Sequence, residues 1–177
     1  MTVIVSSPAN LAGTGLYVGD ITGCASWGPL IPTSGGGEEP WAGVVHACKN
    51  PCHSGAVGTR TLRSDRHEYL SARRGETHLY LNIIDPDAPL FRHEVFQAAL
   101  AFIDERIPRG PVLVHCNQGV SRSPSIALLW LAKRTKVLDK AATFQDARAS
   151  FVAGLYPAYA PGQGIVTFLT EWWERLA

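Results

Sequence analysis

The feature that most constrains this chain is a cysteine and an arginine separated by five residues, placed where a strand-like run meets a helix-like run. Residues 115–123 read HCNQGVSRS, the apolar run PVLV precedes them, and a second apolar run follows at 125–132. Such a loop can curl so that several backbone N–H groups point inward at the positive end of the helix dipole, where they attract an oxyanion. The segment therefore predicts an anion-binding loop with the thiol of Cys116 at its base.

The residue types in this loop suit a phosphate ligand. Gly119 supplies the conformational freedom that a tight curl needs, and Ser123 followed by Pro124 predicts a helix that Ser123 caps. A helix N-terminus and a nearby cation favour the thiolate form of a cysteine, so we expect Cys116 to be a nucleophilic thiolate near neutral pH. The guanidinium of Arg122 can grip two phosphate oxygens at once, which a lysine cannot do. The alternative is that Cys116 is a buried structural thiol.

The segment resembles the signature of the cysteine-dependent protein tyrosine phosphatases, most closely that of the compact dual-specificity branch. The resemblance implies a phosphocysteine intermediate that water hydrolyses, without a cofactor. It implies that His115 supports the loop and that the hydroxyl of Ser123 stabilises the departing thiolate. The sequence departs from the branch at Asn117 and Gln118, before the glycine, where a small residue is common. The residues that the resemblance assigns to substrate binding are His115, Asn117, Gln118, Gly119, Val120, Ser121 and Arg122.

The chemistry also needs an acid, because expelling an alkoxide or phenoxide is slow unless a positioned group protonates it. Asp85 and Asp87 follow the strand-like run 78–84, and Asp85 lies 31 residues before Cys116. The family carries its acid in a corresponding loop, so we choose Asp85 as the general acid and keep Asp87 as the second candidate. Aspartate is also favoured at helix N-caps, and we expect Asp87 to cap a helix that begins near Ala88 or Pro89.

The rest of the chain predicts a single catalytic domain of α/β class, residues 1–177, with a central, mostly parallel sheet flanked by helices, as in the dual-specificity phosphatases. Buried helices should carry core stripes, such as the aromatic and aliphatic residues of the last helix. A flexible Gly/Pro-rich surface loop is expected at 29–40. The expected strands are 16–19, 43–47, 78–84 and 111–116, and the expected helices are 90–107, 124–134, 139–150 and 164–176.

The composition and charge of the chain limit the class of protein and its expected location. Hydrophobic residues make up 46% of the 177 positions and charged residues 18%, which is ordinary for a globular protein. A net charge of +1 gives no support for nucleic-acid binding, and no apolar run has the length of a membrane span. The start of the chain lacks the features of a signal peptide, and four cysteines with one reactive thiol favour a reducing, cytoplasmic location over a disulfide framework.

A second group of residues, His46, Cys48, Cys52 and His53, superficially has the spacing of metal ligands. We favour a structural or redox role and predict no metal, because the run 44–48 has the pattern of a strand that ends beside the catalytic loop. The family includes members in which a cysteine at this strand end forms a reversible disulfide with the nucleophile. Cys48 matches that place, and Cys52 is the second candidate.

The substrate is the least determined property. No lysine or second arginine lies between Cys116 and Arg122, which disfavours inositol phospholipids by comparison with the family. A phosphorylated protein or peptide is expected, with the choice between phosphotyrosine and phosphoserine or phosphothreonine open. The arginines at 60, 63, 66, 73 and 74 are interpreted as a solvated helix face or as an electropositive rim. A phosphate-recognition module without catalysis, a phosphatase of a non-protein phosphomonoester and a C-x5-R enzyme of another fold remain alternatives.

Overall fold

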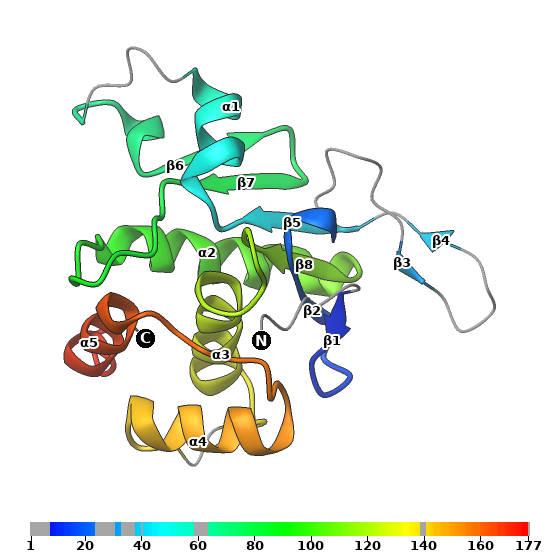
Figure 1. Cartoon of the computed structure of the whole chain (residues 1–177). Coiled ribbons are helices and arrows are strands. Elements are labelled where there is room, and N and C mark those ends of the chain that lie inside the picture. Colours follow the sequence, from blue (N-terminus) through cyan, green and yellow to red (C-terminus); the bar gives the residue numbers. More distant parts are fainter. Residues whose placement is uncertain are drawn as a thin grey trace.

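A six-stranded sheet organises the chain (Figure 1). The computed structural model describes residues 8–23, 31–32, 38–39, 41–58, 64–138 and 141–176. The strand order is β1-β2-β8-β5-β7-β6, with the four inner strands parallel and both edge strands antiparallel to their neighbours. The strands are β1 Ala9–Asn10, β2 Leu16–Gly19, β5 Gly43–His46, β6 Ser71–Arg74, β7 His78–Leu81 and β8 Val112–His115. The predicted α/β class with a mostly parallel central sheet is confirmed.

The middle of the sheet is buried because its strands are continuous apolar runs. Every residue of β5 and β8 is buried, as expected for parallel strands covered on both faces. The registers align Val45 with Val114 and His46 with His115, so these two strands end at the same level. The carboxyl ends of β5 and β8 therefore meet at one edge of the sheet, where the predicted catalytic loop begins.

Helices α2 and α3 contact the sheet, α4 contacts α3 and α5, and α1 lies beside the edge strand β6 (Figure 1). Every residue from Ser123 to Leu131 is buried, in agreement with the apolar run at 125–132. The predicted stripe of the last helix is also core, with Ile165, Phe168 and Leu169 buried. The helices are α1 Ser54–Val57, α2 His93–Arg106, α3 Arg122–Arg134, α4 Phe144–Gly154 and α5 Gln163–Trp172.

Several predicted boundaries were wrong, for identifiable reasons. Helix α3 begins at Arg122 with Ser121 as its N-cap residue, because the hydroxyl of Ser123 points back to the catalytic loop instead of capping. Asp87 caps no helix, since α2 begins at His93 with Arg92 at the N-cap. Helix α4 begins at Phe144, where Thr143 and Asp146 form a reciprocal capping box.

The basic stretch is not a helix face. Residues 71–74 form β6, paired antiparallel with β7, and Ala72 is buried against the sheet. Arg73 forms a bidentate ion pair with Glu105, and Arg74 pairs with Glu68. Arg60 and Arg63 lie outside the described residues. The sequence analysis did not predict β6, because two of its four residues are arginines and the stretch has no clear apolar alternation.

The predicted loop at 29–40 lies largely outside the described residues. Its four described residues form two short antiparallel strands, β3 Ile31–Pro32 and β4 Glu38–Glu39. Across the part of the chain that the structure describes, no helix combines the length and apolarity required to cross a bilayer.

Candidate active site

The loop between β8 and α3 wraps around the sulfur of Cys116. This side chain is 2% exposed, and its Sγ accepts hydrogen bonds from the backbone N–H of Gly119 at 3.3 Å and from the hydroxyl of Ser123 at 3.2 Å. Hydrogen bonds donated to a sulfur stabilise negative charge on it. The loop can therefore hold Cys116 as a nucleophilic anion.

The curl of the loop depends on the backbone at Gly119. Its φ angle is +71°, in the region that residues with a side chain rarely adopt. A Cβ atom at this position would lie 3.1 Å from the carbonyl oxygen of Gly19 and 3.2 Å from the backbone nitrogen of Asp20. The predicted need for glycine is confirmed, for conformation and for the close approach of the segment after β2.

The guanidinium of Arg122 faces the same loop. Its Nη2 donates to Oδ1 of Asn117 at 2.8 Å, and its Nη1 donates to the carbonyl of Ile83 at 3.4 Å. Its Nε is buried and has no hydrogen-bond partner among the residues that the structure describes. A buried donor without a partner is costly unless a ligand satisfies it. The side chain is therefore arranged to receive an anion that supplies the missing acceptor.

The segment 156–162 supports the outer side of the loop. The hydroxyl of Tyr156 donates to the carbonyl of Gly119 at 2.9 Å, the N–H of Ala160 donates to the carbonyl of Val120 at 2.8 Å, and the N–H of Gly162 donates to Oγ of Ser121 at 3.1 Å. Burial, together with the nearby Cys116, raises the pKa of Tyr156 to about 12, so its hydroxyl remains a donor at neutral pH. Sequence reasoning missed this segment because its tyrosines and prolines follow neither a helical nor a strand period.

Asp85 lies against the same segment. It is exposed, and a Cβ atom at Gly162 would approach its Oδ1 to 2.5 Å. A side chain at Gly164 would also collide with the carbonyls of Pro86 and Ala88. The two glycines thus let the loop that carries Asp85 pack onto the start of α5, next to the contact between Gly162 and Ser121. Asp87 is exposed on the same loop.

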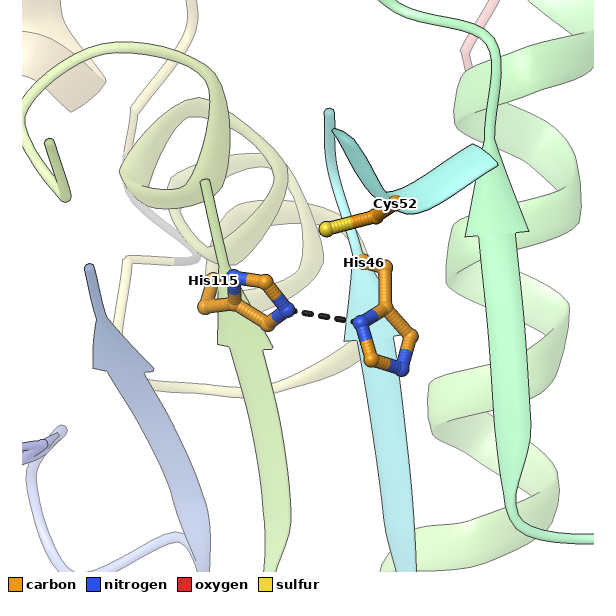
Figure 2. A group of neighbouring side chains, drawn as sticks. All are labelled: His46, Cys52 and His115. Atoms are coloured by element: carbon orange, nitrogen blue, oxygen red, sulfur yellow. Dashed lines mark hydrogen bonds between the residues drawn. The ribbon is translucent and has the colours of Figure 1, made fainter. Parts of the chain in front are cut away.

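His115 belongs to a row of hydrogen-bonded histidines beneath the loop. Its Nδ1 donates to the carbonyl of Cys116 at 3.4 Å, and its Nε2 lies 2.7 Å from Nδ1 of His46 (Figure 2). Nε2 of His46 lies 3.0 Å from Nδ1 of His78, and the ring of Tyr80 stacks on His46 with 4.0 Å between centroids. His46 and His115 are completely buried. The row connects the backbone of the nucleophile to β5 and β7.

The cysteines that follow β5 form a pair of their own. Cys48 is fully buried, and Cys52, 9% exposed, donates hydrogen bonds to its sulfur from both the thiol and the backbone N–H. These bonds lower the pKa of Cys48 to about 7, assisted by His115 and Arg122 and opposed by burial. His53 is separate from the pair, because its Nε2 bonds the carbonyl of Glu68 at 2.9 Å and burial lowers its pKa.

A groove of about 170 Å³ adjoins the loop. The carbonyl of Ile83 connects the two, since it accepts from the N–H of Lys49 and from Arg122. Two cationic residues and several apolar ones line the groove, and Leu90 is 71% exposed at its edge. The lining residues are Lys49, Tyr69, Leu70, Asn82, Ile83, Ile84, Leu90, Phe91, Arg92 and Val95.

The chain is similar in sequence to known dual-specificity phosphatases. It is 38% identical over 92 residues to dual specificity protein phosphatase 26 of Bos taurus, covering 50% of this chain and 38% of that protein. It is 33% identical over 100 residues to MAP kinase phosphatase with leucine-rich repeats protein 2 of Dictyostelium discoideum, covering 56% of this chain and 13% of that protein. The matched region thus spans well under half the length of either relative. No protein-family model matches the sequence.

Solved structures share the fold along nearly the whole chain. The structure of DUSP15 superimposes with a TM-score of 0.63 at 19% identity, covering 96% of this chain and 90% of that one. The human tyrosine phosphatase-like serine/threonine/tyrosine-interacting protein superimposes with a TM-score of 0.60 at 18% identity, covering 97% and 99%. The chain therefore shares its fold with the DUSP15 structure along nearly its whole length, and over about half of its length it is similar in sequence to proteins named as dual specificity and MAP kinase phosphatases.

Proposed function

We propose that this protein is a phosphomonoester hydrolase of the dual-specificity type, that its chain forms one catalytic domain, and that it acts through a phosphocysteine intermediate on Cys116. One observation carries the proposal. The sulfur of Cys116 receives two hydrogen bonds, and the buried Nε of Arg122, which faces the same curled loop, has no partner among the described residues. A phosphate monoester suits both groups. Its phosphorus is an electrophile for the sulfur, and its oxygens are acceptors for the guanidinium and the loop N–H groups.

The reaction has two steps on this arrangement. The Cys116 thiolate attacks phosphorus and forms an S–P bond while the bond to the alcohol oxygen breaks. Water then attacks the phosphocysteine and releases phosphate and the thiolate. Arg122 and the loop N–H groups bind the equatorial oxygens in both transition states. In the phosphate-bound state the guanidinium exchanges its bond with Asn117 for bonds with the substrate.

Asp85 is the proposed general acid. Its carboxyl group is exposed, as a group that protonates a departing alcohol and later accepts a proton from water needs to be. Its loop packs on Gly162 and Gly164, next to the hydrogen bond from Gly162 to Ser121. This packing supports Asp85 over Asp87 as the acid.

The groove beside the loop supports a phosphorylated protein or peptide as the substrate. Lys49 suits an acidic residue that flanks the phosphorylated residue, whereas Arg92 is already paired with Glu94, and the exposed Leu90 suits an apolar residue. A small phosphomonoester would leave this surface unused. Replacement of Lys49 and Leu90 should therefore raise KM for an acidic phosphopeptide and leave turnover of a small aryl phosphate unchanged.

The proposal is tested by measuring hydrolysis of a chromogenic aryl phosphate with a metal chelator present. The wild type should hydrolyse the aryl phosphate. Cys116→Ser should not hydrolyse it, although this variant should still bind tungstate or phosphate. Equal rates in the two proteins, or loss of wild-type activity in the chelator, would contradict the proposal.

A second candidate is a module that binds phosphorylated partners without hydrolysing them. It is favoured by the fold shared with the human tyrosine phosphatase-like serine/threonine/tyrosine-interacting protein. In that case the wild type and Cys116→Ser would bind a phosphopeptide equally, and neither would release phosphate. The same chromogenic assay therefore decides between the two functions.

A further inference from the structure

The structure brings together three soft or borderline metal-ligand groups, with a fourth beside them, that the proposed reaction does not use for bond making. His46, Cys52 and His115 each present a ligand atom, and these atoms all lie within 4.8 Å of one another (Figure 2). Cys48 extends the group, because its sulfur is hydrogen-bonded to Cys52. The sequence pattern alone had paired Cys48 and Cys52 with His53, which the structure directs to the carbonyl of Glu68.

We propose that His46, Cys48, Cys52 and His115 form a site for one Zn²⁺ ion beneath the catalytic loop. Two thiolates and two imidazoles are a common tetrahedral donor set for zinc, and Cys48-x3-Cys52 has a spacing found in such sites. The ligands come from three places: the end of β5, the short helical segment Lys49–His53 and the end of β8. Aligned strand ends hold two of them, so the site is largely built before an ion arrives.

The histidine row determines which ring nitrogens carry protons, and both rings have to tilt when the ion binds, because lone pairs that face each other along a hydrogen bond cannot both point at one ion. The carbonyl of Cys116 only accepts hydrogen bonds, so its partner Nδ1 of His115 carries the proton and Nε2 has a lone pair. Nδ1 of His46 faces that nitrogen at 2.7 Å, and Nε2 of His46 faces His78. If the His46 proton moves from Nδ1 to Nε2, His78 becomes the acceptor. Both nitrogens then offer lone pairs, and His78 fixes the ring in the way that outer partners of metal ligands do.

The change required on binding is small. Zn–N bonds of ~2.0–2.1 Å in a tetrahedral site separate two nitrogens by ~3.3 Å. The rings of His46 and His115 therefore have to part by roughly half an ångström from their hydrogen-bonded distance, and Cys52 has to approach by about one ångström. The thiols of Cys48 and Cys52 each lose a proton to solvent when the ion binds. Cys52 is the most exposed of the four residues, at 9%, whereas the other three are completely buried.

Metal binding at the proposed site can be measured without turnover, so the test does not depend on the proposed function. The full chain carrying Cys24→Ser and Cys116→Ser keeps only Cys48 and Cys52 as thiols. It is reduced with a phosphine and titrated with Co²⁺, which replaces Zn²⁺ and gives a thiolate-to-cobalt charge-transfer absorption. One equivalent should bind with that absorption, and one equivalent of Zn²⁺ should abolish it.

Variants in the same background locate the ion. Cys52→Ala should lose part of the charge-transfer absorption, because Cys48 remains as a thiolate, and it should bind at least ~10-fold more weakly, since even outer partners of metal ligands contribute 10–100-fold. His78→Asn should keep the absorption and weaken binding ~10-fold. His93→Asn is the matched control, because His93 stacks on Trp172 away from the cluster, and it should bind as the background protein does.

Other results would overturn the proposal. Binding without charge transfer, several weak equivalents, or unchanged affinity in Cys52→Ala would mean an adventitious ion only. A Cys48–Cys52 disulfide that persists with reductant and prevents uptake would mean a redox pair instead of a metal site. Circular dichroism of each variant distinguishes loss of metal binding from loss of the fold.

Discussion

The hydroxyl of Ser123 lies 3.2 Å from the sulfur of Cys116 and also 3.2 Å from the carbonyl oxygen of Gly19. A hydroxyl has one proton, so Ser123 can donate to only one of these two acceptors at a time. When the sulfur is anionic the proton is better placed on it, and when the sulfur is bonded to phosphorus the carbonyl can take the bond. The serine is thus positioned to stabilise the thiolate at the step in which the thiolate departs.

Ser123→Ala should therefore slow hydrolysis of the phosphoenzyme more than its formation. A hydrogen bond to a charged group contributes ~1.5–3 kcal/mol, which corresponds to a ~10–100-fold lower kcat. Rapid-quench kinetics should show a burst of product followed by a slow steady state. Ser125→Ala is the matched control, since that hydroxyl bonds the carbonyl of Ser121 and Tyr159 instead of the sulfur. A burst in the control, or none in Ser123→Ala, would count against this role.

Asp85→Asn should impair substrates in proportion to how poor their leaving groups are. General acid catalysis contributes at least ~100-fold, and a phenol that leaves readily needs little of it. A series of aryl phosphates should give a steeper dependence of kcat/KM on the leaving-group pKa in the variant than in the wild type. If Asp87→Asn has that signature and Asp85→Asn does not, the acid has been assigned to the wrong carboxylate.

Arg122→Lys keeps the charge but loses the planar fork and the buried Nε donor. Loss of two charge-assisted hydrogen bonds should lower kcat/KM at least ~100-fold and weaken inhibition by tungstate by a similar factor. Arg134→Lys is the control, because that guanidinium bonds Asp104 on the surface. Similar tungstate affinities for Arg122→Lys and the wild type would place the anion elsewhere.

Cys48 is the proposed partner of an oxidised nucleophile. Cys48 and Cys116 both follow the aligned pair His46 and His115 on neighbouring strands, which lie ~4.8 Å apart. Peroxide converts the Cys116 thiolate to a sulfenic acid, and attack by the Cys48 thiolate then forms the S–S bond and expels hydroxide. Cys48 has to leave its hydrogen bond with Cys52 to do so, and the reaction belongs to the metal-free protein, in which Cys48 is not a zinc ligand.

Peroxide inactivation of the wild type should therefore be reversed by a thiol reductant. In Cys48→Ser the sulfenic acid has no partner and should oxidise further, so activity should not return. Cys52→Ser should recover like the wild type. Full recovery in Cys48→Ser together with none in Cys52→Ser would instead identify Cys52 as the resolving cysteine.

The sequence predicted those parts of the molecule that local patterns determine. The apolar runs of β5 and β8, the buried helix α3 and the glycine at positive φ all follow from residue type and spacing. The supports of the loop could not be predicted, because the contacts from Tyr156 and Gly162 join segments more than thirty residues apart. The same holds for the histidine row, since only the strand register brings His46 to His115.

The predicted starts of helices were wrong where a side chain or its loop makes contacts at the candidate active site. Ser123 has the residue type of a helix cap but directs its hydroxyl to Cys116, and the N-cap position falls on Ser121, whose side chain makes no capping bond. Asp87 likewise has the type of a cap, yet its loop packs against Gly162 and Gly164, and the helix starts later. At these positions tertiary contacts around the loop outweigh the helix-capping propensity of the residue type.

The most direct test of the account is to trap the covalent intermediate. The wild type is mixed with an aryl phosphate and quenched in acid during turnover. The protein is then digested, and the masses of its peptides are measured by mass spectrometry. The account predicts that the peptide containing Cys116 gains one phosphoryl group, that the signal increases in Ser123→Ala, and that it is absent in Cys116→Ser. Phosphate on a different residue, or undiminished turnover in Cys116→Ser with no phosphoenzyme, would contradict it.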